Sequence, residues 1–300
     1  MPELPEVETV RAGVAGAVLG SAVTGVVVRG DRVLRRQVGG TAELRDVVLG
    51  ARLTAAARRG KFLWFVLERA GAPTRSLLVH LGMSGQVLVR TDVARAEQRH
   101  LRLRLELTGG APVALDLLDQ RTFGYVYAGP LVPTPDGLPG GTGSQLAAVP
   151  EPVVHIARDL LDPYLDRDAV LARFGRRRSG VKRVLLDQTV VSGVGNIYAD
   201  EALWRAGLHP ESSSDTLSPR EVSALLDAAE HVMRDALAEG GTTFDGLYVD
   251  VNGASGYFDR SLAVYGQAGR PCPRCGATVV RSAFMNRSSF TCPRCQGHAR

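Results

Sequence analysis

The sequence lacks any apolar run long enough to cross a membrane, and it has few cysteines and almost no lysine. Its 300 residues hold four cysteines and, among 36 basic residues, only Lys61 and Lys182 as lysines. A transmembrane helix needs about 18 or more consecutive apolar residues, and the acidic first six residues do not resemble a secretory signal peptide. Four cysteines are too few for a disulfide scaffold of this size. We therefore expect a globular, cytoplasmic protein without a membrane anchor.

Acidic residues are also missing from the last 40 residues, 261–300, which carry six arginines. This segment contributes +6 to a formal net charge of +5, so the rest of the chain is close to neutral. A second basic cluster consists of Arg173, Arg176, Arg177, Arg178, Lys182 and Arg183. A near-neutral body with a basic end indicates an anion-binding surface, most often for nucleic acid. The alternative is a solvated basic tail.

The first half of the chain is predicted to be a β-sandwich with a packed N-terminal helix. Apolar residues recur at helical spacing over 3–19, and Pro2 and Pro5 fall where the first turn would be. Residues 101–107 alternate strictly between leucine and charged side chains, as in a half-buried antiparallel strand. Strands are predicted at 23–29, 47–57, 61–67, 77–81, 86–90, 101–107, 113–118 and 123–127.

Residues 129–150 are rich in proline and glycine and predict a linker or surface excursion. The second half is predicted to be helical, at 153–161, 167–174, 181–188, 196–206 and 218–239. Ser218, Pro219 and Glu221 are typical of a capped helix start, and Gly240-Gly241 of a helix end. The prediction is an α+β protein with domains over 1–150, 151–262 and 263–300.

The four cysteines form two Cys-x-x-Cys pairs, Cys272 with Cys275 and Cys292 with Cys295, separated by 16 residues. A β-hairpin over this gap would bring four thiolates to one ion, which predicts a single structural Zn²⁺ with a closed tetrahedral shell. Two disulfides are the alternative, disfavoured because nothing directs the chain to an oxidising compartment.

Two further segments could carry chemistry. Gly193 and Gly195 precede Asn196 at a predicted helix start, where outward-facing amides could bind a phosphate, or the glycines could simply allow a tight turn. If Met1 is removed, Pro2 supplies a secondary amine beside Glu3 and Glu6. Such an amine can condense with an aldehyde to an iminium, an electron sink for elimination. The alternative is that the two acidic residues only stabilise the helix start.

Several motifs together resemble one family. PELPEVETV at 2–10, HLGMSG at 80–85, DQRTFG at 119–124, SGVGNIYADE at 192–201 and the two CPRC pairs are similar to bacterial formamidopyrimidine-DNA glycosylase. This is a base-excision repair enzyme for 8-oxoguanine and ring-opened purines, in a helix-two-turn-helix superfamily shared with endonuclease VIII. The resemblance implies a helix-two-turn-helix domain ending in a four-cysteine zinc-finger hairpin. It also implies damaged duplex DNA as the partner, with no nucleotide cofactor and a monomeric enzyme.

The resemblance assigns roles to individual residues. It implies that Pro2 is the nucleophile at C1′ for glycosylase and β,δ-elimination (AP lyase) activity. Glu3 would handle protons at the sugar, Glu6 would orient the flipped nucleotide, and Lys61 would contact a phosphate. Arg287 would bind the DNA backbone, and the resemblance places it among the catalytic residues together with Pro2, Glu3, Glu6 and Lys61. The implied DNA-binding residues are His100, Lys182 and Asn196, with Met83, Arg121 and Phe123 filling the gap left by the flipped base.

The sequence departs from the family pattern at Thr122, where many members have a second arginine, and no role is apparent for 129–150. Residues 245–258 cover the loop that closes over the flipped base in the 8-oxoguanine enzymes. Two alternatives remain: an oxidised-pyrimidine glycosylase of the endonuclease VIII type, whose usual opening is PEGPE-like, and a catalytically inactive zinc-dependent DNA-binding protein.

Overall fold

A computed structural model of the chain describes residues 2–92, 99–241 and 261–300. They form two compact units. The first unit holds the described residues up to 155 together with Gly240 and Gly241, and the second holds 156–239 and 261–300. Residues 263–300 thus fold with 156–239, and the finer division into three domains stays a prediction. The mixed helical and antiparallel architecture confirms the α+β class.

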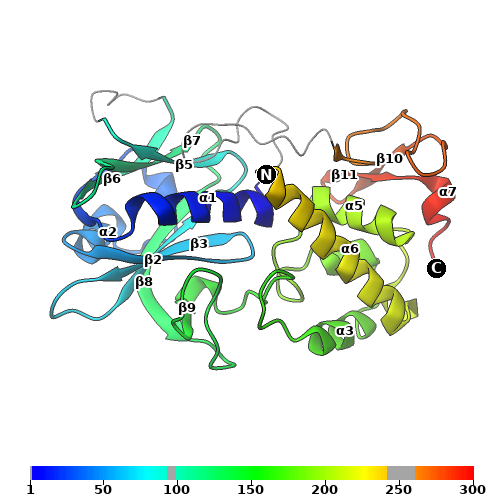
Figure 1. Cartoon of the computed structure of the whole chain (residues 1–300), viewed down its shortest axis with the longest axis horizontal. Helices are drawn as coiled ribbons and strands as arrows, with labels where there is room; N and C mark the ends of the chain where they lie inside the picture. Colours follow the sequence, from blue (N-terminus) through cyan, green and yellow to red (C-terminus); the bar gives the residue numbers. More distant parts are fainter. Residues whose placement is uncertain (1, 93–98, 242–260) are drawn as a thin grey trace. The chain divides into compact units, whose positions relative to one another are not determined.

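The first unit is an antiparallel sheet around a helix, as expected. Its strands follow the order β5-β7-β6-β1-β2-β3-β4-β8-β9. β1 and β2 share only the pair Ala22 with Arg52, and the sheet divides there into two layers with α1 (Leu4–Val18) between them (Figure 1). The strands are β1 (Ala22–Val28), β2 (Arg52–Arg59), β3 (Phe62–Glu68), β4 (Arg75–His80), β5 (Gly85–Arg90), β6 (Leu101–Thr108), β7 (Ala114–Asp119), β8 (Tyr125–Pro133) and β9 (Ala148–Pro150).

The apolar face of α1 explains why the helix is held so firmly. Val7, Val10, Val14 and Val18 are each at most 1% exposed and lie in one core with residues of both sheet layers. Burying a valine side chain contributes on the order of 1.5 kcal/mol or more. The start of this helix, which carries Pro2 and Glu3, is therefore fixed against the sheet.

The predicted strand over 47–57 is partly wrong. Residues up to Val48 end helix α2 (Gly40–Val48), and the strand begins only at Arg52. Valines 47 and 48 favour a strand locally, but Leu44 and Val48, four residues apart, bury one helix face in the core. The short 3-10 helix η1 (Asp31–Leu34) precedes α2.

Of the two alternatives predicted for 129–150, a linker or a surface excursion, the linker is wrong. β8 continues to Pro133 and pairs with β9 through Leu131–Pro150, Val132–Val149 and Pro133–Ala148. Pro150 is tolerated because it lies on β9, an edge strand, where a missing backbone N–H costs little. The segment is therefore a hairpin of the first unit.

The second unit is mainly helical. Its elements are α3 (Arg167–Gly175), α4 (Val181–Leu185), α5 (Asn196–Ala206), η3 (Ser214–Thr216), α6 (Pro219–Ala238), β10 (Val280–Phe284), β11 (Arg287–Thr291) and α7 (Pro293–Gln296). The capping box of α6 is confirmed, with Ser218 N donating to Glu221 Oε2 at 2.9 Å. None of the described helices has the length and apolar character needed to span a bilayer.

The predicted helix over 153–161 is wrong. Only the 3-10 helix η2 (Glu151–Val153) forms at its start, in the first unit. Beyond it, the carboxylates of Asp159 and Asp162 accept hydrogen bonds from the backbone N–H groups of Leu161 and Tyr164. Such local bonds give the backbone an alternative to helix formation.

Candidate functional site

The N-terminal segment places three of the predicted catalytic residues at one helix start. Pro2 is buried, and Glu3 and Glu6 are each 2% exposed. Glu6 Oε2 accepts a hydrogen bond from Glu3 N at 2.8 Å, in the reciprocal pattern of a capping box. The carboxylate of Glu6 also faces Gly241, where a Cβ would lie 3.2 Å from Oε1. The two acids cap the helix and still hold carboxylates beside Pro2, so capping and chemistry do not exclude each other.

Lys61 lies in the two-residue turn between β2 and β3. Arg59 pairs with Phe62 across this turn, and Gly60 has a φ of 55°, as the first position of a tight hairpin turn requires. Lys61 is 9% exposed. Its charge acts on His80, whose pKa is lowered to about 4 by burial first and then by Lys61, Arg35 and Arg36. His80 is therefore neutral at physiological pH, and Lys61 is the cation of this turn.

The predicted gap-filling residues come from two loops that are bound together. Ser84 Oγ donates to Asp119 Oδ1 at 2.6 Å, and Arg121 N donates to the same carboxylate oxygen at 3.1 Å. The loops touch through their backbones at Gly82, where a Cβ would lie 2.4 Å from the carbonyl carbon of Phe123. Only glycine fits there, and its φ is 63°.

The same two loops expose their apolar side chains. Met83 and Phe123 are each 40% exposed, and the Arg121 guanidinium lies 5.3 Å from the Phe123 ring centroid. The structure thus brings Met83, Arg121 and Phe123 together on one rigid edge of the first unit. Thr122 between them has a φ of 56°, so the departure from the family pattern occurs in a strained backbone position.

Arg35 adds a support for this edge that sequence reasoning missed. Its guanidinium donates to the carbonyls of Phe123 at 2.6 Å and Gly124 at 2.5 Å and lies 4.8 Å from the Tyr125 ring centroid. Nothing in the sequence pairs position 35 with positions 123–125. The only available signal was the surplus of arginines near 32–36.

His100 lies just before β6 with a φ of 73°, and its carbonyl accepts a hydrogen bond from Asp119 N at 2.9 Å. His100 is therefore linked to the strand that leads into the Arg121 loop. Its expected contact with the DNA backbone stays a prediction. The loop expected to close over a flipped base, 245–258, lies outside the described residues.

The expected DNA contact of Lys182 needs correction. Its side chain is 0% exposed, and its Nζ lies 2.7 Å from Asp200 Oδ1 and 2.9 Å from Ser289 Oγ. The Phe284 ring centroid lies 4.4 Å from the same ammonium group. A cation enclosed in this way has no face left for a phosphate. Lys182 instead joins α4 to α5 and to the hairpin β10–β11, and Asp200 is the partner that sequence reasoning missed.

Asn196 and Arg287 lie close to this junction. Asn196 begins α5 and donates from Nδ2 to the carbonyl of Ser288 at 2.9 Å. Its Oδ1 is buried without a hydrogen-bond partner. Arg287 is exposed at the start of β11, and Arg281 on β10 donates to Ser288 Oγ at 2.8 Å. The phosphate contacts expected for Asn196 and Arg287 stay predictions, and the helix start and basic hairpin that they need are both present.

The four cysteines gather into one cluster. Their sulfur atoms all lie within 4.8 Å of one another. Cys272 and Cys295 are 3.8 Å apart and Cys275 and Cys292 3.4 Å apart, far longer than a disulfide bond of about 2.05 Å. A tetrahedral zinc with bonds of about 2.3 Å separates its sulfur ligands by similar distances. The cluster fits one structural Zn²⁺, as predicted, with four thiolates completing the shell.

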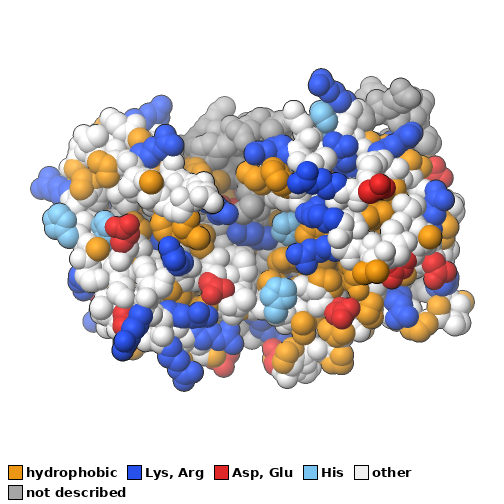
Figure 2. Space-filling view, turned by 180° about the vertical axis from the view of Figure 1, so that it is seen from behind, with side chains coloured by type: hydrophobic (Ala, Val, Ile, Leu, Met, Phe, Trp, Pro, Cys, Tyr) orange, Lys and Arg blue, Asp and Glu red, His pale blue; other side chains and the backbone are white. Residues whose placement is uncertain are grey.

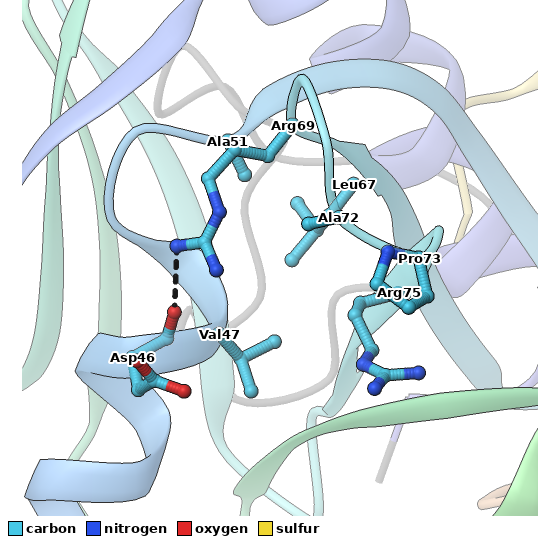
Figure 3. A pocket seen from close by; sticks show the side chains of 8 residues that line it. All are labelled: Asp46, Val47, Ala51, Leu67, Arg69, Ala72, Pro73 and Arg75. Atoms are coloured by element: carbon cyan, nitrogen blue, oxygen red, sulfur yellow. Dashed lines mark hydrogen bonds between the residues drawn. The ribbon is translucent and has the colours of Figure 1, made fainter.

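Basic side chains are prominent on the surface shown in Figure 2. On the face shown in Figure 2, Lys and Arg side chains are more numerous than Asp and Glu side chains. A small pocket of about 90 Å³ in the first unit is also basic, with Arg69 and Arg75 on its wall (Figure 3). It lies by Leu67, at the end of β3 opposite to Lys61, and Arg69 already donates to Asp46 O at 2.9 Å. None of the predicted catalytic or DNA-binding residues lines this pocket.

Sequence models of one family match most of the chain. The formamidopyrimidine-DNA glycosylase N-terminal domain matches residues 1–126, and the H2TH domain of the same family matches 156–246. A zinc finger found in FPG and IleRS matches 269–297. Along the chain, the three matches correspond in turn to the first unit, the helical part of the second unit and the cysteine cluster.

Relatives and solved structures agree with these matches. Proteins named formamidopyrimidine-DNA glycosylase are 55% identical in Kineococcus radiotolerans, over 99% of this chain and 97% of the relative, and 53% identical in Mycobacterium avium, over 100% of both. The crystal structure of the MutM (FPG) protein from Thermus thermophilus matches with a TM-score of 0.80 and 32% identity, over 100% of both chains. Lactococcus lactis Fpg in complex with DNA containing an abasic site matches with a TM-score of 0.81 and 26% identity, over 99% of this chain and 100% of the other. The chain belongs to the formamidopyrimidine-DNA glycosylase family.

Proposed function

We propose that this protein is a bifunctional DNA glycosylase and AP lyase of base-excision repair, which removes oxidised purines from duplex DNA and cleaves the strand. The observation that carries the proposal is the helix start at which Pro2 is buried beside the carboxylates of Glu3 and Glu6. Names of the relatives support it, and solved structures of Lactococcus lactis Fpg contain DNA with Fapy-dG or an abasic site.

The nucleophile is the Pro2 nitrogen, freed by removal of Met1. The positive end of the α1 dipole and the burial of Pro2 both favour a free amine over an ammonium. The nitrogen attacks C1′ of the damaged nucleotide, the bond from C1′ to the base breaks, and the base leaves. The Glu3 carboxylate accepts the proton that the Pro2 nitrogen loses and passes it to the sugar oxygen as the ring opens, while the departing base takes a proton from water. An iminium between Pro2 and C1′ remains.

The iminium then drives strand cleavage. Its positive charge acidifies the hydrogen on C2′, so that loss of this proton breaks the C3′–O bond, and a second elimination breaks the C5′–O bond. Before either step the nucleotide must leave the stack, because C1′ is not reachable inside a duplex. Glu6 orients the flipped nucleotide, and Lys61 and Arg287 hold phosphates of the damaged strand.

The remaining residues hold the DNA that is left behind. His100 and Asn196 bind the backbone, while Met83, Arg121 and Phe123 enter the gap beside the orphaned base. Lys182 takes no part in DNA contact and fixes the zinc hairpin instead. We also propose that the enzyme acts as a monomer in the cytoplasm, where its DNA substrate is located.

Borohydride trapping tests this function. Duplexes with 8-oxoguanine opposite cytosine should give a covalent complex with the processed protein, and duplexes with an oxidised pyrimidine should give much less. Pro2→Gly should weaken trapping, and an N-terminal extension should abolish it. Preferential trapping on the pyrimidine would favour the endonuclease VIII type, and tight binding without any trapping would favour an inactive DNA-binding protein.

A further inference from the structure

The proline- and glycine-rich hairpin between β8 and β9 has no part in the function proposed above, yet it makes close contact with β2. The residues in contact are Gly140–Gly143, here called the glycine segment. Arg58 and Thr142 exchange backbone hydrogen bonds, each of 2.9 Å, in a short antiparallel bridge. Arg59 Nε donates to the carbonyl of Gly140 at 2.7 Å. The glycine segment therefore covers the last two residues of β2, directly before the turn that holds Lys61.

The composition of the segment follows from this approach. A Cβ on Gly141 would lie 2.3 Å from the carbonyl oxygen of Arg58 and 2.8 Å from Cη2 of Trp64. A Cβ on Gly143 would lie 2.3 Å from the carbonyl oxygen of Ala56. Real Cβ atoms do not approach backbone oxygen this closely. Larger residues at these two positions would push the segment away from β2, so Gly141 and Gly143 are required by contact with the strand.

The Arg58 side chain contacts three elements: α1, the turn between β2 and β3, and the β8–β9 hairpin. Its side chain is 1% exposed, and its Nε lies 2.7 Å from Glu8 Oε2, on the helix that carries Glu3 and Glu6. One Nη donates to the carbonyl of Gly60 at 3.1 Å, and the other lies 3.4 Å from Thr142 Oγ1. The carbonyl of Gly60 belongs to the peptide bond of Lys61, so this hydrogen bond orients the Lys61 backbone. A planar guanidinium with five donors can serve these three acceptors at once.

We propose that Arg58, held in place by the glycine segment, is a positioning residue that sets Lys61 relative to the helix carrying Glu3 and Glu6. The proposal rests on the function proposed above, in which Lys61 binds a phosphate next to the reacting sugar. Misplacement of a catalytic group by about 1 Å can cost roughly 100-fold in rate. Arg58 and the glycine segment thus support the placement of Lys61, and the rest of the β8–β9 hairpin is not needed for it.

Gly141→Ala is the first variant for a test, because the added methyl group meets the carbonyl of Arg58 and leaves every side chain of the site unchanged. Gln145→Ala is the matched control, since Gln145 is exposed in the same hairpin. Single-turnover excision of 8-oxoguanine opposite cytosine measures the chemical step. We expect Gly141→Ala to lower this rate roughly 10- to 100-fold, with equilibrium DNA binding changed far less, and Gln145→Ala to match the wild type.

A double-mutant cycle shows whether the loss passes through Lys61. We expect Lys61→Ala alone to slow excision, but a slow single turnover can still be followed for hours. If the glycine segment acts by placing Lys61, Gly141→Ala has little further effect in the Lys61→Ala background, because coupled residues are not additive. A merely structural role predicts equal fold losses in both backgrounds, and that result would overturn the proposal.

Further outcomes are also decisive. Equal rates for Gly141→Ala and wild type would overturn the proposal. If Gly141→Ala loses its cooperative melt, Arg58→Lys takes its place in the same cycle: lysine keeps the charge opposite Glu8 but cannot serve Gly60 and Thr142 together. A wild type that neither excises nor traps would overturn the proposed function itself, whereas an active wild type with additive losses overturns only the role of Arg58 and the glycine segment.

Discussion

The ammonium group of Lys182 lies 2.7 Å from Oδ1 of Asp200, and the two side chains are 0% and 1% exposed. Asp200 also accepts hydrogen bonds from Ser289 Oγ at 2.9 Å and from Phe290 N at 3.0 Å. Through these contacts the ion pair helps to join α4 and α5 to the hairpin β10–β11, which carries Arg287. Lys182 therefore affects DNA binding through the placement of the hairpin.

Removing one residue of the Lys182–Asp200 ion pair should lower the free energy of unfolding strongly. Removing both residues should lower it much less. Lys182→Met leaves the Asp200 carboxylate buried and unpaired, for which we expect a loss of roughly 3–5 kcal/mol in the free energy of unfolding of the second unit. Adding Asp200→Leu should recover most of this loss. Denaturant unfolding followed by Trp204 fluorescence measures both variants. An unchanged transition in Lys182→Met would show that the pair does not stabilise the unit.

Arg287→Ala should weaken DNA binding without loss of zinc. The exposed guanidinium is expected to meet one phosphate, so the slope of log affinity against log salt should fall by roughly one. Arg234→Ala is the control, since Arg234 is exposed on α6 and paired with Glu230 at 2.7 Å. A variant with the salt dependence of the wild type would contradict the phosphate contact.

Zinc removal should affect the two units differently. Cys272→Ser breaks the thiolate cluster, and the Cys272 sulfur accepts a hydrogen bond from Trp204 Nε1 at 3.3 Å. A short metal-bound segment takes its folding free energy largely from the ion, so we expect lost DNA binding and a changed Trp204 emission. The cooperative melt of the first unit should persist, because its hydrophobic core contains none of the zinc ligands, and the buried Trp64 of this unit can report on it. Loss of that melt would show that zinc stabilises the whole chain.

Some of these features could be predicted from the sequence because they depend on neighbouring residues. The capping residues Ser218, Pro219 and Glu221 and the spacing of the cysteines are local signals, and both predictions are confirmed. The burial of Lys182 could not be predicted in this way. Its position in a basic cluster indicates a solvated side chain, and only the fold brings Asp200, 18 residues away in the sequence, to its ammonium group.

The same limit applies to the first unit. The prolines and glycines of 129–150 agree with the absence of a helix from this segment, although β8 extends into it as far as Pro133. Whether such a segment leads away from the domain or folds back on it depends on a contact with Arg58, more than 80 residues earlier. Composition alone does not contain that information.

His80 should make stability depend on pH. It stacks on Tyr125, with ring centroids 5.1 Å apart, and its Nδ1 accepts a hydrogen bond from Gly82 N at 3.1 Å. Its pKa is lowered to about 4, against about 6.5 in an unfolded chain. Between these values the unfolded state binds more protons, so the free energy of unfolding falls as pH drops from 6.5 to 4.

We expect the loss from His80 to be roughly 1–3 kcal/mol over this range. His80→Gln should remove this part of the pH dependence, whereas the exposed His298, changed to glutamine, should not. Denaturant unfolding between pH 4 and 7 measures the difference. If His80→Gln retained the pH dependence of the wild type, His80 would not be its source.

Arg121 should read the base opposite the lesion. Extruding a purine leaves a gap in the stack, at a cost of a few kcal/mol, and Met83 and Phe123 can wedge into it as intercalating side chains do. The Arg121 guanidinium lies beside Phe123 and has donors but no acceptor. It can therefore satisfy the acceptors O2 and N3 of an orphaned cytosine, but not the amino group of an orphaned adenine.

The enzyme should thus prefer lesions opposite cytosine, which repair requires, because excision opposite a misinserted adenine would fix a mutation. Arg121→Ala should lose single-turnover rate mainly opposite cytosine and narrow the ratio between the two partners. The guanidinium is exposed, while the bond from Arg121 N to Asp119 belongs to the backbone and survives the change, so the melting temperature should hardly move. An equal loss opposite both bases, or a large drop in melting temperature, would mean that Arg121 serves only to shape the loop.

Arg35→Met separates base reading from loop shaping. It removes the two hydrogen bonds that hold the Phe123–Gly124 backbone, and should therefore slow excision opposite both bases alike.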